Sequence, residues 1–176
     1  MDKVGNNFSK TEVGFLDENV FKLIGDDWML ITAGNADDFN MMTASWGTMG
    51  VLWNKPIAVC FIRPQRYTFK FAVKYDYFTL SFFDEKYRNI LQLCGSRSGR
   101  NVNKVEATGL RPLQTNLGNI CFEQSRLFFE CRKLYCQDLK PENFVIPEIA
   151  TLNYPSKDFH RLFIGEIVNC YHKKSR

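Results

Sequence analysis

The chain has few residues that can bind a transition metal or act as a catalytic base. It has two histidines among 176 residues, and its six cysteines form no C-x-x-C pair. Structural zinc sites use four closely spaced Cys or His ligands, so we expect no metal site. A Ser-His-Asp or Cys-His centre would have to use His160 or His172, and His172 lies in a basic tail. We therefore do not expect triad hydrolysis.

Signatures of several protein classes are also missing. The sequence contains no G-x-G-x-x-G, G-x-x-x-x-G-K-[ST], H-E-x-x-H or G-x-S-x-G motif, which argues against the enzyme classes that use them. No apolar run approaches the ~20 residues of a membrane span, and no apolar signal region follows Met1. Because free cysteines suit a reducing compartment, we expect a cytoplasmic protein without a membrane partner.

Neither sign of charge is in large excess. Lys+Arg 23 minus Asp+Glu 19 gives a net charge of +4, which by itself does not indicate binding to nucleic acid or a membrane surface. Hydrophobic residues make up 45% and charged residues 24%, as in globular proteins. The length predicts one domain over residues 1–176, with residues 1–12 as a polar, flexible N-terminal segment.

Aromatic residues, by contrast, are abundant at 15% of the chain, with Phe 16, Tyr 7 and Trp 3. Aromatics favour half-buried pleated surfaces and so predict a β-rich fold. Part of this surplus would suit a pocket for a flat ligand or a subunit interface, although ordinary core packing accounts for most of it.

Apolar patterning predicts mostly strands. Short apolar runs indicate strands over residues 20–24, 28–32, 57–62, 78–83, 127–137 and 162–170, and another begins at residue 40 but ends in small and polar residues by 47. Alternation along 127–137 predicts one buried face, with Glu130 on the other. With no βαβ alternation, an antiparallel barrel or sandwich is favoured over a Rossmann sheet.

Two short helices are expected among these strands. Phe69, Ala72 and Val73 recur with helical spacing after Thr68, which is well placed to cap the first turn. Residues 87–94 show the same period, and Gly95 is expected to end that helix.

Anion-binding groups concentrate in three segments. Residues 43–47 offer hydroxyl and backbone N–H groups beside small residues, residues 63–68 place two arginines before a helix, and residues 95–100 form a loop with two more. Each alone is compatible with a solvated basic turn or a helix cap. Together they predict a phosphate-bearing ligand whose remainder is flat and unsaturated.

Five segments in order carry these features. They are residues 40–47 (Asn-x-x-Thr-Ala-Ser-Trp-Gly), 63–68 (Arg-Pro-x-Arg-Tyr-Thr), 78–82 (Phe-Thr-Leu-Ser-Phe), 98–112 (Ser-Gly-Arg-x-x-x-Lys-x-Glu-x-Thr-Gly-Leu-x-Pro) and 160–167 (His-x-x-Phe-x-Gly-Glu-Ile). Over nearly the whole chain this set resembles the flavin reductase-like, FMN-binding split-barrel family, which includes flavoredoxins.

The resemblance implies a mainly β fold with a few short helices, a Greek-key split β-barrel of the FMN-binding type. It also implies a homodimer with non-covalent FMN near the interface. The cofactor-binding residues that it implies are Thr43, Ala44, Ser45, Trp46, Arg63, Arg66, Tyr67, Thr68, Ser81, Ser98, Arg100, Lys104 and His160. Ser81 stands near a position where many relatives have asparagine. Core packing for Trp46 and a helix cap for Thr68 are the alternative roles.

The implied activity is that of an NAD(P)H-dependent flavin reductase-like oxidoreductase. It would transfer a hydride from NADH or NADPH to FMN and pass electrons to an unidentified acceptor, chemistry that belongs to the cofactor and needs no side-chain base. No catalytic residue is assigned. An FMN-binding electron carrier or sensor without NAD(P)H activity stays open. A nucleic-acid-binding barrel is disfavoured because its arginines lie in compact loops.

Overall fold

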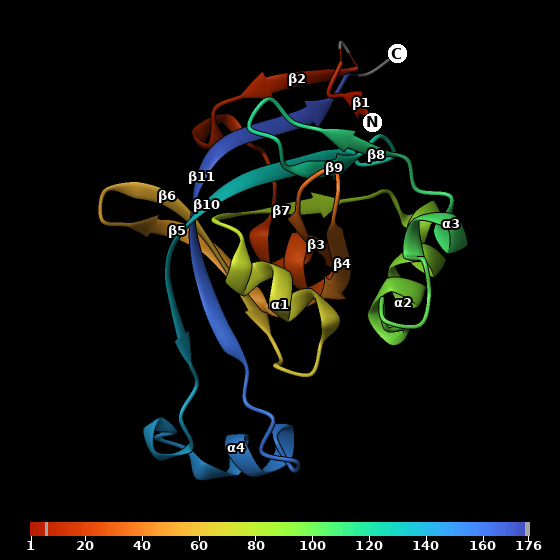
Figure 1. The fold of residues 1–176 in the computed structure, drawn as a ribbon. Helices are drawn as coiled ribbons and strands as arrows, with labels where there is room; N and C mark the ends of the chain where they lie inside the picture. The colour runs from red at the N-terminus through yellow and green to blue at the C-terminus, as the bar shows by residue number, and fades with distance from the viewer. Residues whose placement is uncertain (6, 175–176) are drawn as a thin grey trace.

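The computed structural model describes residues 1–5 and 7–174 (Figure 1). Its strands are β1 (Asp2–Lys3), β2 (Phe8–Thr11), β3 (Met29–Gly34), β4 (Phe39–Ala44), β5 (Gly47–Leu52), β6 (Lys55–Ile62), β7 (Tyr77–Phe82), β8 (Pro112–Gln114), β9 (Ile120–Phe122), β10 (Leu127–Asp138) and β11 (Arg161–Lys173). The α-helices are α1 (Tyr67–Lys74), α2 (Arg88–Ser96), α3 (Lys104–Thr108) and α4 (Pro147–Asn153). Short 3-10 turns cover Val13–Phe15, Glu85–Tyr87 and Pro141–Asn143, and a π-helical turn covers Lys22–Asp26.

Most strands belong to one antiparallel sheet with the order β4-β3-β7-β10-β11-β6-β5, and β2 pairs with β11 beside this path. A second sheet, β1-β8-β9, includes the parallel pair β1–β8. The prediction of a mainly β fold is therefore confirmed. Strands β4 and β5 are consecutive in sequence but lie at opposite ends of the main path. The short link between them, Ser45 and Trp46, joins the two ends of the sheet.

Gly47 makes this link sterically feasible. A Cβ atom at this position would lie 2.7 Å from the carbonyl oxygen of Val59 and 2.9 Å from the Cε atom of Met29. Only glycine lets β5 begin this close to β6. The small residues that end the predicted strand at 40–47 thus mark a corner between two strands.

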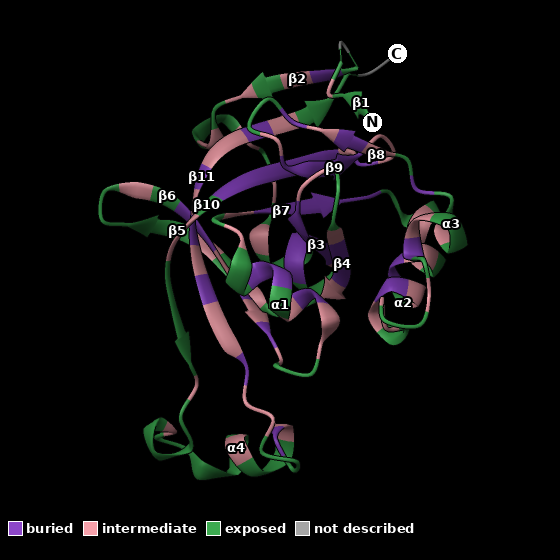
Figure 2. Ribbon diagram, viewed as in Figure 1, coloured by how far each residue is buried: buried purple, intermediate pink, exposed green. Residues whose placement is uncertain are grey.

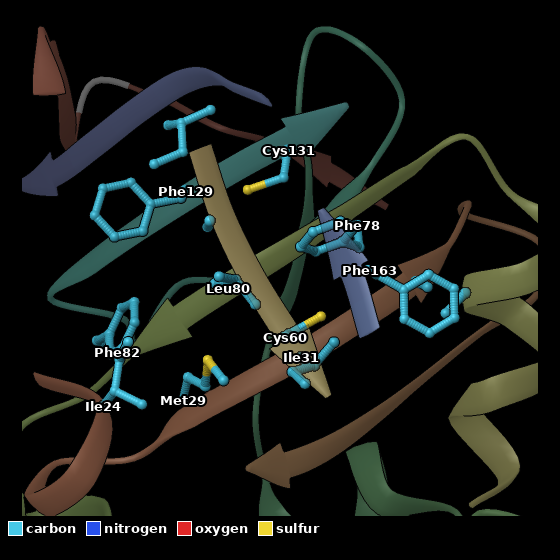
Figure 3. Packing of buried hydrophobic residues seen from close by; sticks show 14 of the residues in the cluster. Ile24, Met29, Ile31, Cys60, Phe78, Leu80, Phe82, Phe129, Cys131 and Phe163 are labelled. Atoms are coloured by element: carbon cyan, nitrogen blue, oxygen red, sulfur yellow. The ribbon is translucent and has the colours of Figure 1, made fainter. Parts of the chain in front are cut away.

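Side chains of the main sheet form the core. Figure 3 shows side chains from β3, β6, β7, β10 and β11 meeting there, with Phe82 and Phe129 packed edge to face at a centroid distance of 5.8 Å. Cys60 and Cys131 lie in the same cluster, and burial raises the pKa of Cys60 to about 12. Such buried thiols act as small apolar side chains.

Strands β10 and β11 pair as far as Asp138 and Arg161, and residues 139–160, which we call the arm, connect them. Figure 1 shows the arm, with α4, beyond the ends of these two strands. Figure 2 shows the strands of the core as mostly buried and the arm as mostly exposed. The arm has a small aromatic cluster of Phe144, Tyr154 and Phe159, with Tyr154 and Phe159 stacked at 4.6 Å.

One predicted strand and one predicted helix end are wrong for local reasons. Residues 20–24 form the start of a helical turn, because the Asn19 side chain accepts hydrogen bonds from the N–H groups of Phe21 and Lys22. Gly95 does not end α2, which continues to Ser96. The missing side chain of Gly95 instead lets α2 approach Thr43, whose Cβ atom would lie 3.4 Å from an added Cβ.

The predicted solvent face of residues 127–137 is also wrong for the first half of β10. Glu130 is fully buried, because the β8–β9 hairpin covers this face. Its carboxylate accepts hydrogen bonds from Thr115, from Asn119 (2.7 Å) and from Asn169 (2.6 Å). These donors compensate the burial of the carboxylate.

Candidate functional site

Two adjoining cavities lie where β4 ends, and both include Thr43, Ala44 and Ser45 in their walls. The first has a volume of about 300 Å³ and is also lined by Met42, Trp46, Phe61, Arg63, Arg66 and His160. The second has a volume of about 470 Å³ and is completed by Trp28, Leu91, Gln92, Gly95 and Ser96. We call the two together the β4 groove.

Helix α2 fixes the floor of the groove. The Thr43 hydroxyl donates a 2.6 Å hydrogen bond to the carbonyl of Leu91, which joins β4 to α2. The guanidinium group of Arg66 donates to the carbonyl of Gly95 at 2.6 Å, at the C-terminal end of α2. A cation at this end of a helix is favourable because the last carbonyls lack helical partners. Arg66 thus both lines the groove and caps α2.

Aromatic rings form the wall near β6. Trp46 is 46% exposed, so the alternative of core packing for this residue is wrong. Its ring centroid lies 5.2 Å from that of His160, and Phe61 meets His160 edge to face at 6.4 Å. These rings give the groove an apolar surface beside the two arginines.

His160 is neutral at pH 7. It is 8% exposed, and burial lowers its pKa to about 4, with the nearby Arg63 charge adding to the shift. Its Nδ1 atom lies 2.9 Å from the hydroxyl of Tyr154. The residue therefore offers the groove hydrogen bonding and ring surface without positive charge.

Arg63 links the groove to the arm. Its guanidinium group donates a 2.5 Å hydrogen bond to Asp158 and a 2.9 Å hydrogen bond to the carbonyl of Asn153, and it lies 5.1 Å from the centre of the Tyr154 ring. The hydrogen bond from Arg63 lowers the pKa of Asp158. The carboxylate of Asp158 is consequently ionised near neutral pH.

Three other predicted residues line a separate cavity of about 670 Å³: Tyr67, Arg100 and Lys104. The guanidinium group of Arg100 lies 5.0 Å from the centre of the Tyr67 ring. Lys104 is buried and donates to the carbonyls of Met41 (2.8 Å) and Cys94 (2.9 Å). Burial lowers its pKa to about 8.

The remaining three predicted residues line neither the β4 groove nor the separate cavity of Tyr67, Arg100 and Lys104. Thr68 is buried within α1, and its backbone N–H and hydroxyl reach the side-chain oxygen of Asn40, so Asn40 performs the capping role expected of Thr68. Ser81 is fully buried in β7. Ser98 accepts a 3.3 Å hydrogen bond from the N–H of Arg100.

Four groove or arm residues were missed from the sequence: Trp28, Phe61, Tyr154 and Asp158. Trp28 has a positive φ of 66°, an unusual conformation for a bulky residue, and no sequence signal marks it. Phe61 could have been found, because it alternates with the buried Cys60 and Ile62 along β6. Tyr154 and Asp158 follow no motif.

Neither a metal site nor a membrane-spanning helix is present in residues 1–5 and 7–174. No cluster of three or more His, Cys, Asp or Glu side chains there is arranged to hold a metal ion. None of the helices in the same residues has the length and apolar character needed to cross a membrane.

The chain belongs to the flavin reductase-like family: the family's model, described as the flavin reductase like domain, matches residues 23–176. The resemblance inferred from the five ordered segments is thereby confirmed. A search of curated proteins gave no match.

Solved structures support the fold. An FMN-binding protein from Thermus thermophilus with bound p-hydroxybenzaldehyde is 22% identical, with a TM-score of 0.68 over 95% of this chain and 82% of that chain. The flavoredoxin of Desulfovibrio vulgaris (Miyazaki F) is 18% identical, with a TM-score of 0.65 over 94% and 78%. Nitrilotriacetate monooxygenase component B from Bacillus cereus is 16% identical, with a TM-score of 0.65 over 84% and 69%. The predicted split-barrel fold is confirmed.

Proposed function

We propose that the chain is an FMN-binding oxidoreductase that holds FMN non-covalently in the β4 groove and accepts a hydride from NADH or NADPH. It then passes electrons to an acceptor that is still to be identified. The observation that carries this proposal is the combination of two arginines with aromatic rings in the wall of one groove. We further propose a cytoplasmic homodimer with FMN near the subunit interface, as the family resemblance implies.

The residues of the groove fit the chemistry of FMN. Arg63 and Arg66 offer guanidinium groups to a phosphate, and Trp46, Phe61 and His160 offer ring surface to a flat ring system. The link between β4 and β5 exposes the backbone and hydroxyl of Ser45 beside them. The two cavities, about 300 and 470 Å³, together fall within the usual size of a cofactor site.

FMN, when bound, supplies the hydride-accepting chemistry. The chain's own part is binding and orientation: Arg63 and Arg66 hold the charged end, and the aromatic wall limits access of water. Because His160 is neutral, it supplies no proton at neutral pH. For Tyr67, Thr68, Ser81, Ser98, Arg100 and Lys104, contact with the cofactor stays a prediction, since these residues lie outside the groove.

The test is an FMN titration of the purified protein, followed by rapid mixing with NADH or NADPH while the flavin absorption band is recorded. Saturable binding and rapid bleaching are expected. Binding without bleaching by either nucleotide would replace the enzyme by the electron carrier or sensor. Failure to bind FMN would overturn the proposal.

A pair of variants places the binding in the groove. Ala44→Trp should abolish FMN binding, because Ala44 lines both cavities. Val51→Trp introduces the same side chain at an 80% exposed position of β5 and should bind FMN normally. Equal binding by the two variants would place the site elsewhere.

A further inference from the structure

The Asp158 carboxylate occupies the anion-binding side of Arg63. Its Oδ2 atom accepts the 2.5 Å hydrogen bond from Arg63 and another from the side chain of Gln65. Arg63 is itself a lining residue of the groove. The guanidinium group that we assign to a ligand phosphate is thus already paired with a carboxylate from the arm.

The pairing is incomplete on the carboxylate side. The Oδ1 atom of Asp158 is buried and has no hydrogen-bond partner among the described residues. A buried acceptor without a partner is costly. Asp158 therefore uses only one of its two carboxylate oxygens in side-chain hydrogen bonds. An incoming anion that can engage more of its oxygens is able to compete with Asp158 for Arg63.

The same contact fastens the arm to the groove. Hydrogen bonds from Arg63 and Gln65 to Asp158, and from Arg63 to the carbonyl of Asn153, connect the end of β6 with the arm. Most side chains of the arm are exposed, including Val145 at 97% and Leu152 at 79%. Local opening costs little free energy in a segment with so little buried surface.

We propose that Asp158 determines the ligand specificity of the groove by acting as an internal competitor for Arg63, which a phosphomonoester displaces, and that this displacement releases the arm. The inference rests on the proposed function and extends it to ligand selection. A phosphomonoester carries about −1.5 to −2 charges at pH 7, against −1 for a carboxylate. It can therefore take over the guanidinium group, whereas an uncharged flavin leaves the contact between Arg63 and Asp158 intact.

The test compares wild type with Asp158→Asn, which keeps an oxygen for Arg63 but removes the charge. Dissociation constants are measured for FMN and for riboflavin, which has the same ring and no phosphate. Asp158→Asn should tighten FMN binding about threefold to tenfold, the range for one partly exposed ion pair, and leave riboflavin unchanged. Glu148→Gln is the matched control, because it removes a carboxylate from an exposed position of α4 and should change neither constant.

Hydrogen exchange of the arm is the second readout. In wild type, FMN should speed exchange of the Tyr154 and Lys157 amides, which are bonded within the arm, and riboflavin should not. In Asp158→Asn these amides should exchange rapidly without ligand. Weaker FMN binding by Asp158→Asn would mean that Asp158 orients Arg63, and would overturn the inference, as would an arm that FMN protects or leaves unchanged.

Inorganic pyrophosphate separates this inference from the proposed function. If wild type binds no flavin, the proposed function fails, but pyrophosphate that speeds exchange in the arm would still support competition for Arg63. An arm that responds to neither FMN nor pyrophosphate would overturn the inference.

Discussion

The main sheet and the arm differ in how their apolar residues are used. In the sheet, Phe82, Phe129 and Phe163 are all less than 2% exposed and lie in one cluster. In the arm, the aliphatic residues of α4 and the segment before it face solvent, and the three aromatics form only a small cluster. Free energy of folding is therefore concentrated in the sheet.

The groove lies at the border of these two regions. In its floor, Thr43 and Ala44 belong to β4 and Thr43 is hydrogen-bonded to α2, whereas Arg63 contacts the arm and His160 is part of the arm. We therefore infer that the sheet sets the position of a ligand and that the arm sets its charge preference. Four predictions test this division.

The largest effect is expected from Phe163→Ala in the sheet. Phe163 is 0% exposed and packs against Phe69 at 6.2 Å. Loss of a fully buried phenyl ring leaves a cavity and should lower the free energy of unfolding by about 3–5 kcal/mol. Denaturant titration measures the free energy of unfolding. A decrease of less than about 1 kcal/mol would contradict the assignment of stability to this cluster.

The next effect depends on pH and concerns His160. Its pKa is about 4 in the folded chain and about 6.5 when unfolded. Between these values the unfolded state binds the extra proton, so stability is full above pH 6.5 and is lost as the pH falls toward 4. Relative to His160→Gln, wild type should lose about 3 kcal/mol over this range. If the free energy of unfolding depends on pH in the same way for the two proteins, burial does not lower the pKa of the His160 imidazole.

A smaller effect is expected from Arg63→Met. Loss of one charge-assisted contact should weaken FMN binding about tenfold to hundredfold, while riboflavin binding changes little. The same variant should speed hydrogen exchange in the arm, since its hydrogen bonds to Asp158 and Asn153 are removed. Equal losses for FMN and riboflavin would indicate that Arg63 contacts the ring and not the phosphate.

The smallest effect is expected from Leu152→Ser. The side chain is 79% exposed on α4, so the free energy of unfolding should change by less than about 0.5 kcal/mol. A thermal melt beside that of Phe163→Ala provides the comparison. A large loss would mean that another surface covers α4 in solution, such as a second copy of the chain.

Local patterns predicted most strands but not the contacts that close the site. The continuous apolar run of β6 and the alternation of β11 identify buried strands directly. Glu130 was misplaced because the hairpin that covers it comes from elsewhere in the chain. The partner of Arg63 was missed because Asp158 lies 95 residues away, in an arm whose sequence shows no period. Long-range polar pairs leave no trace in local spacing.

Seven of the thirteen predicted cofactor residues line the groove: Thr43, Ala44, Ser45, Trp46, Arg63, Arg66 and His160. The order of the five sequence segments could indicate these residues, but it could not separate the β4 groove from the cavity lined by Tyr67, Arg100 and Lys104. Tyr67 directly follows Arg66 in sequence and yet lines that separate cavity and not the groove, because α1 begins at Tyr67 and its side chains point in a new direction.

The most direct test of the account is a parallel titration of wild type and Ala44→Trp with FMN and riboflavin. The account predicts that wild type binds both flavins, with tighter binding of FMN, and that Ala44→Trp binds neither while keeping the wild-type unfolding transition. Wild type that binds no flavin, or an Ala44→Trp variant that binds FMN as wild type does, would contradict the assignment of the β4 groove as the flavin site.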